Sequence, residues 1–313
     1  MSKESSQKKI KTILFGAGPG AVNFIANCRA KRDFIAFLDN NPDKNGTYYE
    51  GLPVYLPKAL HELDFDEVVI TTQWAEEVKI QLRDDEKVAI SKIVVPKKNQ
   101  LKKPYPFENQ NSANLAREII LGLSRLGSKA GAELVVDFGT LLGIVRDGDI
   151  IPWDDDVDFA APVGSELEIE QILRTFIEDS THPLIWSIRK VTRNDGVCTS
   201  LLLEFSENTE HNETYKSFTS SVSFRENVDG RSLHLPSIGM WYAPEHHFAG
   251  ADSIEWRGQE ILVPKDHLAY LTFQYGDWQT PVKDIQFDDY AHIQSVSFEE
   301  VKAAGISVEN LKP

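Results

Sequence analysis

The densest group of reactive side chains is an acidic run in the second half of the chain, Trp153-Asp154-Asp155-Asp156-Val157-Asp158-Phe159. Side chains alternate between the two faces of a β-strand, so an extended segment would direct Asp154, Asp156 and Asp158 to one side. Aspartate is a poor strand former, and two unit charges about 4 Å apart repel by about 4 kcal/mol at an effective dielectric constant of about 20. Such a face needs protons, solvent or a cation, and clustered carboxylate oxygens favour Mg²⁺ or Mn²⁺. A solvated acidic loop is the alternative interpretation.

A candidate phosphate-binding segment precedes the acids. Gly139 and Thr140 stand between a predicted strand and a predicted short helix, where backbone N–H groups and a hydroxyl can hold a phosphate. Arg146, about two helical turns further on, could add a two-pronged contact, although an ordinary surface ion pair would explain it as well. A carboxylate-bound cation facing a phosphate is the arrangement of phosphoryl or nucleotidyl transfer, in which Asp155 or Asp158 is a candidate base.

The amino-terminal region carries a second candidate site, the glycine-rich turn Gly16-Ala17-Gly18-Pro19-Gly20-Ala21. The turn follows a predicted strand, opens a predicted helix and fits the dinucleotide-binding pattern G-x-G-x-x-G/A. Asp39 ends the next predicted strand, 23 residues after Gly16, where an acid would meet a ribose hydroxyl. We therefore predict a nucleotide, coenzyme or nucleotide-sugar at Gly16, Gly18, Gly20 and Asp39. A turn that keeps its shape without a ligand is the alternative.

The elements around these sites predict two domains of different class. Residues 1–105 alternate strands (12–15, 34–38, 68–71, 93–95) with helices (22–29, 74–82), which is typical of a Rossmann-like α/β domain. Residues 106–313 mix strands and helices without that alternation, which indicates an α+β domain. The expected helices there cover 112–129, 140–145, 166–176 and 267–275, and the expected strands cover 133–136, 155–160, 199–205, 220–224, 232–235 and 261–263. Between the domains, residues 96–106 hold four lysines and three prolines, which favours a linker.

Charge and composition limit the partners and the compartment. The net charge of −15 argues against nucleic acid as a partner. Residues 1–110 hold 17 basic and 15 acidic residues, so the remaining 16 basic and 33 acidic residues give the rest of the chain a net charge of −17. No signal peptide, no transmembrane segment and no pairing logic for Cys28 and Cys198 can be recognised, and a cytoplasmic protein is expected. A homo-oligomer is compatible with the sequence, which does not specify the oligomeric state.

Two motifs resemble the LicD family, which includes the fukutin-related proteins. The first joins Gly139-Thr140-Leu141-Leu142-Gly143, Arg146, Gly148 and Ile151-Pro152-Trp153-Asp154-Asp155-Asp156-Val157-Asp158, and the second is Tyr275-Gly276-Asp277-Trp278 with Pro281. The resemblance spans about residues 112–285. It implies a nucleotidyltransferase-like fold and metal-dependent transfer of a phosphorylated group, phosphocholine- or phospho-alditol-like, from a CDP-activated donor to a glycan acceptor in cell-surface polysaccharide modification.

The resemblance also implies roles for individual residues. Asp154, Asp156 and Asp158 would ligate Mg²⁺, Gly139 and Thr140 would line the donor phosphates, and Arg146 would support them. One departure concerns a later strand, where many members carry an aspartate and this chain has His234. Glu204 is an alternative source of that carboxylate, although an alternating strand would also place it toward solvent. Two other functions remain open: nucleotidyl transfer from an NTP, and a non-catalytic module that binds a nucleotide-sugar.

Overall fold

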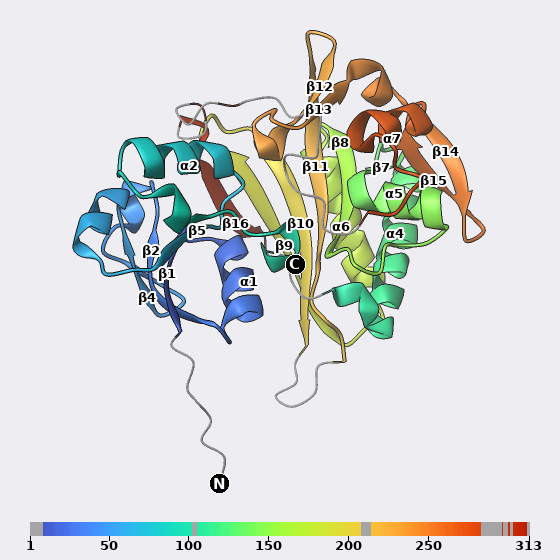
Figure 1. Ribbon diagram of the computed structural model, residues 1–313. Coiled ribbons are helices and arrows are strands. Elements are labelled where there is room, and N and C mark those ends of the chain that lie inside the picture. Colours follow the sequence, from blue (N-terminus) through green and yellow to red (C-terminus); the bar gives the residue numbers. More distant parts are fainter. Residues whose placement is uncertain are drawn as a thin grey trace. The chain divides into compact units, whose positions relative to one another are not determined.

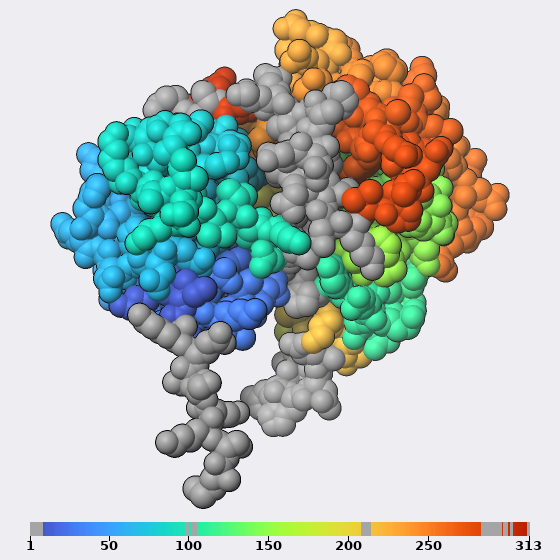
Figure 2. Space-filling view, viewed as in Figure 1, coloured from blue at the N-terminus to red at the C-terminus, as the bar shows by residue number. Residues whose placement is uncertain are grey.

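The chain separates into two compact units in a computed structural model that describes residues 9–101, 105–207, 214–282, 296, 300 and 303–311. The described part of the first unit ends at Leu101, and the second unit begins at Tyr105. Part of the predicted linker, residues 102–104, and the amino-terminal residues 1–8 lie outside the described residues. Figure 1 draws the elements of both units, and in the space-filling view the blue-to-teal residues of the first unit form one contiguous body (Figure 2).

The first unit is a parallel sheet with helices packed on it, in the order β3-β4-β2-β1-β5-β6. Only the short β3 runs antiparallel to its neighbour among these strands. The first strand lies inside the sheet, with β2 and β4 on one side and β5 and β6 on the other, which is the Rossmann-like arrangement predicted from the alternation. The elements are β1 (Ile10–Phe15), α1 (Pro19–Cys28), β2 (Arg32–Leu38), β3 (Tyr48–Tyr49), β4 (Leu52–Tyr55), β5 (Glu67–Ile70), α2 (Ala75–Asp84), β6 (Ile93–Val94) and α3 (Lys98–Leu101).

Both faces of this sheet are buried, which explains why its strands are continuously apolar. Leu14 of β1 packs in the cluster that holds Phe24 of α1, whereas its neighbour Phe15 packs in the cluster that holds Leu82 of α2. A strand covered on both faces gains from apolar side chains at every position.

The second unit is built on a mixed sheet with the order β13-β12-β11-β10-β9-β16, in which β8 pairs with β11 and β7 pairs with β8. The strands β14 and β15 form a separate hairpin. The elements are α4 (Gln110–Ala130), β7 (Val135–Val136), α5 (Phe138–Asp147), β8 (Asp156–Pro162), α6 (Glu166–Asp179), β9 (Leu184–Arg193), β10 (Cys198–Glu207), β11 (Thr219–Val228), β12 (Arg231–His234), β13 (Tyr242–Pro244), β14 (Ala251–Trp256), β15 (Gln259–Pro264), α7 (His267–Tyr275) and β16 (Ile306–Leu311).

One core holds this unit together. The apolar stripe of α4, with Ile119 and Leu123, shares a buried cluster with Leu173 of α6 and with Phe159 and Leu203 of the sheet. The inward side chains of β8 belong to this core, so the other face of β8 is available to polar groups. Within the described part of the chain, no helix combines the length and the apolar character needed to cross a membrane.

Candidate functional site

The strand β8 presents two acids to the face of the sheet opposite the core. Val157 and Phe159 are buried, whereas Asp156 and Asp158 are only partly buried. Asp158 lies opposite Ser221 of the parallel strand β11, and the Ser221 hydroxyl donates a 2.9 Å hydrogen bond to Asp158 Oδ1. The alternation predicted for this segment is therefore present at Asp156 and Asp158.

The acids before β8 do not continue the alternation, because the strand begins only at Asp156. The backbone N–H of Asp154 closes a turn onto the carbonyl of Ile151 (3.0 Å). One carboxylate oxygen each from Asp154, Asp155 and Asp156 lies within 4.8 Å of the others. The structure thus gathers three consecutive acids, including Asp155, which the strand pattern had left out of the ligand set. Asp158, predicted as a third ligand, is not in this group, and its ligand role stays a prediction.

Asp158 lies close to other carboxylates. Burial, followed by the neighbouring Asp154 carboxylate, raises the pKa of Asp158 to about 7. The carboxylates of Asp137 and Asp155 act in the same direction, and the Ser221 hydroxyl partly opposes them. A carboxyl group with this pKa can take up or release a proton near neutral pH.

The start of α5 is built against these acids. A Cβ added to Gly139 would lie 2.2 Å from Asp154 Oδ2, so only glycine lets this carboxylate approach the helix start. Thr140 is buried, and its hydroxyl oxygen accepts the backbone N–H of Asp158 at 2.9 Å. Gly139 therefore leaves the space that the Asp154 carboxylate occupies, and Thr140 holds the Asp158 backbone in place. The Thr140 hydroxyl still has its own O–H to donate, so its predicted contact with a donor phosphate stays a prediction.

Arg146 forms a two-pronged ion pair with the adjacent Asp147, at 2.9 and 2.7 Å. Its side chain is 8% exposed. This arrangement matches the ion pair that was the alternative interpretation, and the predicted contact of Arg146 with a phosphate stays a prediction.

Glu204 and His234, the two candidates for a later carboxylate position, have different surroundings. The Glu204 carboxylate accepts a hydrogen bond from the hydroxyl of Thr219, which lies opposite Asp156 on β11. The same carboxylate is paired with the guanidinium of Arg189. His234 packs edge-on against the ring of Phe138, with centroids 5.3 Å apart. Burial, followed by the nearby Arg225, holds the pKa of His234 well below its ordinary value, so the imidazole is neutral. His234 is thus a packing residue at the start of α5.

The glycine turn of the first unit has the predicted conformation. Gly16 has a φ of +106°, which favours glycine. A Cβ on Gly20 would lie 2.5 Å from the Thr71 carbonyl oxygen, so this glycine allows α1 to pack on the sheet, whereas a Cβ on Gly18 would meet nothing within 4 Å. Gly18 is therefore the position at which the backbone is open to a ligand.

Asp39 directly follows β2, where the sequence predicted it, and its carboxylate has partners within the chain. Its Oδ2 accepts the backbone N–H of Ala17 (3.1 Å) and the ammonium of Lys44 (2.8 Å). The other oxygen accepts the N–H of Asn41 at 2.9 Å. The carboxylate expected to meet a ribose thus ties the glycine turn to the chain after β2, and a ribose would compete with Lys44 for it.

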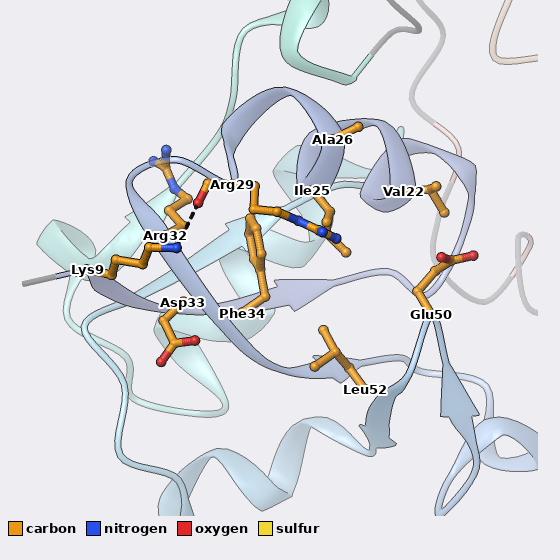
Figure 3. A pocket seen from close by; sticks show the side chains of 10 residues that line it. All are labelled: Lys9, Val22, Ile25, Ala26, Arg29, Arg32, Asp33, Phe34, Glu50 and Leu52. Carbon is orange, nitrogen blue, oxygen red and sulfur yellow. Dashed lines mark hydrogen bonds between the residues drawn. The ribbon is translucent and has the colours of Figure 1, made fainter. Parts of the chain in front are cut away.

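A cavity of about 360 Å³ lies beside the same sheet, near the beginnings of β2 and β4 (Figure 3). Its lining includes Phe34 and Arg32, near the beginning of β2, and Leu52, at the beginning of β4, whereas the glycine turn follows the end of β1. Arg32 is already paired with Glu67 at 2.6 Å. The sequence offered no signal for this cavity, because its lining residues come from separate segments without a motif.

Sequence reasoning also missed a buried polar network at the start of α5. Asp137 is fully buried, and its Oδ2 accepts Arg225 Nη2 at 2.7 Å. Tyr270 of α7 donates its hydroxyl to the other oxygen, Oδ1. Asp137 lies between the predicted strand 133–136 and the predicted helix 140–145, which was a usable signal for a helix cap. Nothing in the sequence linked it to Arg225 or Tyr270.

The acidic group has the donor chemistry of a Mg²⁺ or Mn²⁺ site. Three carboxylates supply oxygen ligands, and Gly139 leaves the space that Asp154 needs. The residues present therefore fit such an ion.

Comparison with known proteins finds related domains in both units. Residues 131–266 match the family described as LicD/FKTN/FKRP, nucleotidyltransferase domain, and residues 8–94 match the family described as C2185-like, N-terminal. The uncharacterized protein RP689 of Rickettsia prowazekii is 23% identical over 176 residues, which cover 56% of this chain and 59% of that protein. The chain thus spans less than two thirds of this curated relative.

Solved structures give weaker similarity. A putative nucleotidyltransferase from H. pylori is 12% identical, with a TM-score of 0.27, over 49% of this chain and 53% of that one. UDP-D-quinovosamine 4-dehydrogenase from Vibrio fischeri is 23% identical, with a TM-score of 0.23, over 28% of this chain and 75% of that one. Such low TM-scores carry no argument about function. The segment that matches the LicD/FKTN/FKRP family, residues 131–266, contains Gly139, Thr140, Arg146 and the whole acidic run.

Proposed function

We propose that the protein is a Mg²⁺- or Mn²⁺-dependent transferase that moves a phosphorylated group from a CDP-activated donor to a hydroxyl of a glycan. In this proposal the second unit has a nucleotidyltransferase-like fold, and the transferred group is phosphocholine- or phospho-alditol-like. The family of residues 131–266 supports transfer of this kind. The product would belong to a cell-surface polysaccharide.

The observation that carries the proposal is the grouping of Asp154, Asp155 and Asp156 within 4.8 Å of one another, beside the glycine start of α5. Acids on a solvated loop would be driven apart by their mutual repulsion. Here Gly139 leaves room for Asp154 because it has no Cβ. Asp158, two residues after Asp156 on β8, is held by Thr140 and Ser221. The fold keeps the charges together, as a cation site requires.

The acids and Ser221 have separate roles in this proposal. Asp154, Asp155 and Asp156 would hold the ion, which when bound neutralises phosphate oxygens and polarises the phosphorus centre. Ser221 orients the Asp158 carboxylate through Oδ1, so Oδ2 is the atom proposed to take the proton of the attacking hydroxyl. The pKa of about 7 suits Asp158 to that task. The oxygen–phosphorus bond to the acceptor forms as the bond to CMP breaks, and CMP leaves.

The test is a product assay with CDP-choline, CDP-ribitol and CDP-glycerol as donors, with and without Mg²⁺. We expect metal-dependent release of CMP, slowly to water and faster with a glycan acceptor. Release of pyrophosphate from an NTP would instead identify nucleotidyl transfer. If neither CMP nor pyrophosphate is released and the protein binds a nucleotide-sugar, the domain is a non-catalytic module.

For the first unit we propose a nucleotide-linked ligand at the open backbone of Gly18, with Gly16 shaping the turn and Gly20 bringing α1 close to the sheet. A thermal-shift panel of nucleotides and nucleotide-sugars against the whole chain tests this proposal. Gly18→Val should remove any ligand-dependent shift, because its side chain would fill the approach to the turn. A shift that survives this substitution would place the ligand elsewhere, for instance at the cavity of Figure 3.

A further inference from the structure

We propose that Arg225 and Tyr270 are positioning residues for the metal site, acting through Asp137 and the start of α5. The inference rests on the proposed function and deepens it. Neither residue is part of the acidic group itself. They come from β11 and α7, and both bond to Asp137, which directly follows β7.

The three side chains form a closed buried network. Asp137 and Tyr270 are fully buried, and Arg225 is 3% exposed. Arg225 Nη2 donates to Asp137 Oδ2 at 2.7 Å and to the Tyr270 hydroxyl oxygen at 3.3 Å. Burial, followed by the Asp137 charge, raises the pKa of Tyr270 well above its ordinary value, so its hydroxyl remains a proton donor. A buried carboxylate with this many donors keeps one orientation.

This fixed carboxylate sets the first residue of α5. Asp137 Oδ1 accepts the backbone N–H of Phe138 at 2.8 Å, and Phe138 has a φ of +44°, in the left-handed region that a bulky residue rarely adopts. The Arg225 guanidinium lies 5.1 Å from the centre of the Phe138 ring, and His234 packs edge-on against the same ring. A conformation of this kind persists only where its surroundings hold it.

The next two residues touch the acids. Gly139 follows Phe138 and contacts the Asp154 carboxylate, and Thr140 accepts the N–H of Asp158. The Asp137 N–H itself donates to the Asp158 carbonyl at 3.0 Å. A loosened network would therefore change the direction of the helix start against which Asp154 lies, and the spacing of the carboxylates with it.

Tyr270→Phe tests the inference, because it removes one hydroxyl donor and keeps the ring. The matched control is Tyr215→Phe, whose hydroxyl is also hydrogen-bonded, to His182 Nδ1 at 3.2 Å, among residues of other elements. The full chain and both variants are titrated with Mn²⁺ alone and followed by electron paramagnetic resonance, and thermal unfolding is recorded for each. We expect Tyr270→Phe to weaken Mn²⁺ binding by about tenfold, the low end of the effect of outer-shell partners, with Tyr215→Phe unchanged.

Three results are distinguishable. Weaker Mn²⁺ binding in Tyr270→Phe alone, at a melting temperature close to that of Tyr215→Phe, supports the inference. Equal affinity in all three proteins overturns it and leaves the proposed function standing. A wild-type chain that does not bind Mn²⁺ refutes the proposed metal site, and the positioning role falls with it.

Discussion

Two strand–glycine–helix turns in this molecule differ in how each holds its acid. In the first unit, Asp39 accepts an N–H of the glycine turn and is paired with Lys44. In the second unit, Asp154 lies against Gly139 in the company of further carboxylates. The same local motif can thus neutralise its acid with a neighbouring lysine, or place its acid among further carboxylates. This difference is the reason why we propose a cation at the second turn and not at the first.

Removal of one charge from the acidic group should have the largest effect. Asp156→Asn should lower metal-dependent CMP release by about 10³-fold, or about 4 kcal/mol, since a neutral amide is a poor ligand for Mg²⁺. Asp229→Asn is the matched control, because Asp229 lies in a turn with a φ of +51° that asparagine tolerates. Retained turnover in Asp156→Asn, with normal activity of the control, would refute the ligand role.

The crowded acids should make the metal-free protein less stable as the pH rises. The pKa of Asp158 is about 7 in the folded chain against an ordinary value of 3.8, so this group contributes stability that is fully present below about pH 4 and lost as the pH rises through 7. A shift of about 3 units corresponds to at most about 4 kcal/mol. Urea unfolding in EDTA at pH 5 and pH 8 measures the loss. Asp158→Asn should reduce it, and an unchanged pH dependence in that variant would contradict the assignment.

The close approach of Gly139 to Asp154 predicts an intermediate effect. Gly139→Ala places a methyl group where Asp154 Oδ2 now lies, so the carboxylate must turn away. We expect kcat to fall by about 10- to 100-fold, or about 1.4 to 2.7 kcal/mol, with the fold preserved. Gly127→Ala in α4 is the control, because its Cβ would come no closer than 3.3 Å to its nearest neighbour, the Leu134 Cβ. If Gly139→Ala is as active as this control, the Asp154 carboxylate tolerates a methyl group at position 139 and the prediction is wrong.

Neutralisation of the paired acid in the first unit should have the smallest effect. Asp39→Asn removes the ion pair with Lys44, whose side chain is 42% exposed, and keeps an oxygen for the Ala17 N–H. The expected loss of stability is below about 1 kcal/mol, as for other exposed pairs. Differential scanning calorimetry of the whole chain measures it. A loss of stability several times larger would mean that Asp39 stabilises the glycine turn more than its hydrogen bonds and its ion pair indicate.

The elements that the sequence predicted are those with a clear local pattern. The final helix was predicted with the bounds that α7 has, and β1, β2, β5 and α4 were predicted to within a few residues. The strands β9 and β16 were missed. β9 carries Arg189, Lys190 and Arg193 along its length, which hides its apolar alternation, and β16 is defined mainly by its antiparallel pairing with β9. Strand pairing over such sequence distances leaves no periodic signal in either segment.

By itself the sequence determined the acidic run, the glycines beside it and the alternation of Asp156 and Asp158 with the core residues of β8, because these depend on neighbours in the chain. Only the tertiary structure decided that Asp155 joins the acidic group, because the chain turns just before β8 begins. It also brought Arg225 and Tyr270 to Asp137 from 88 and 133 residues away. Buried polar partners are selected by the packing of distant elements, and no local pattern records that choice.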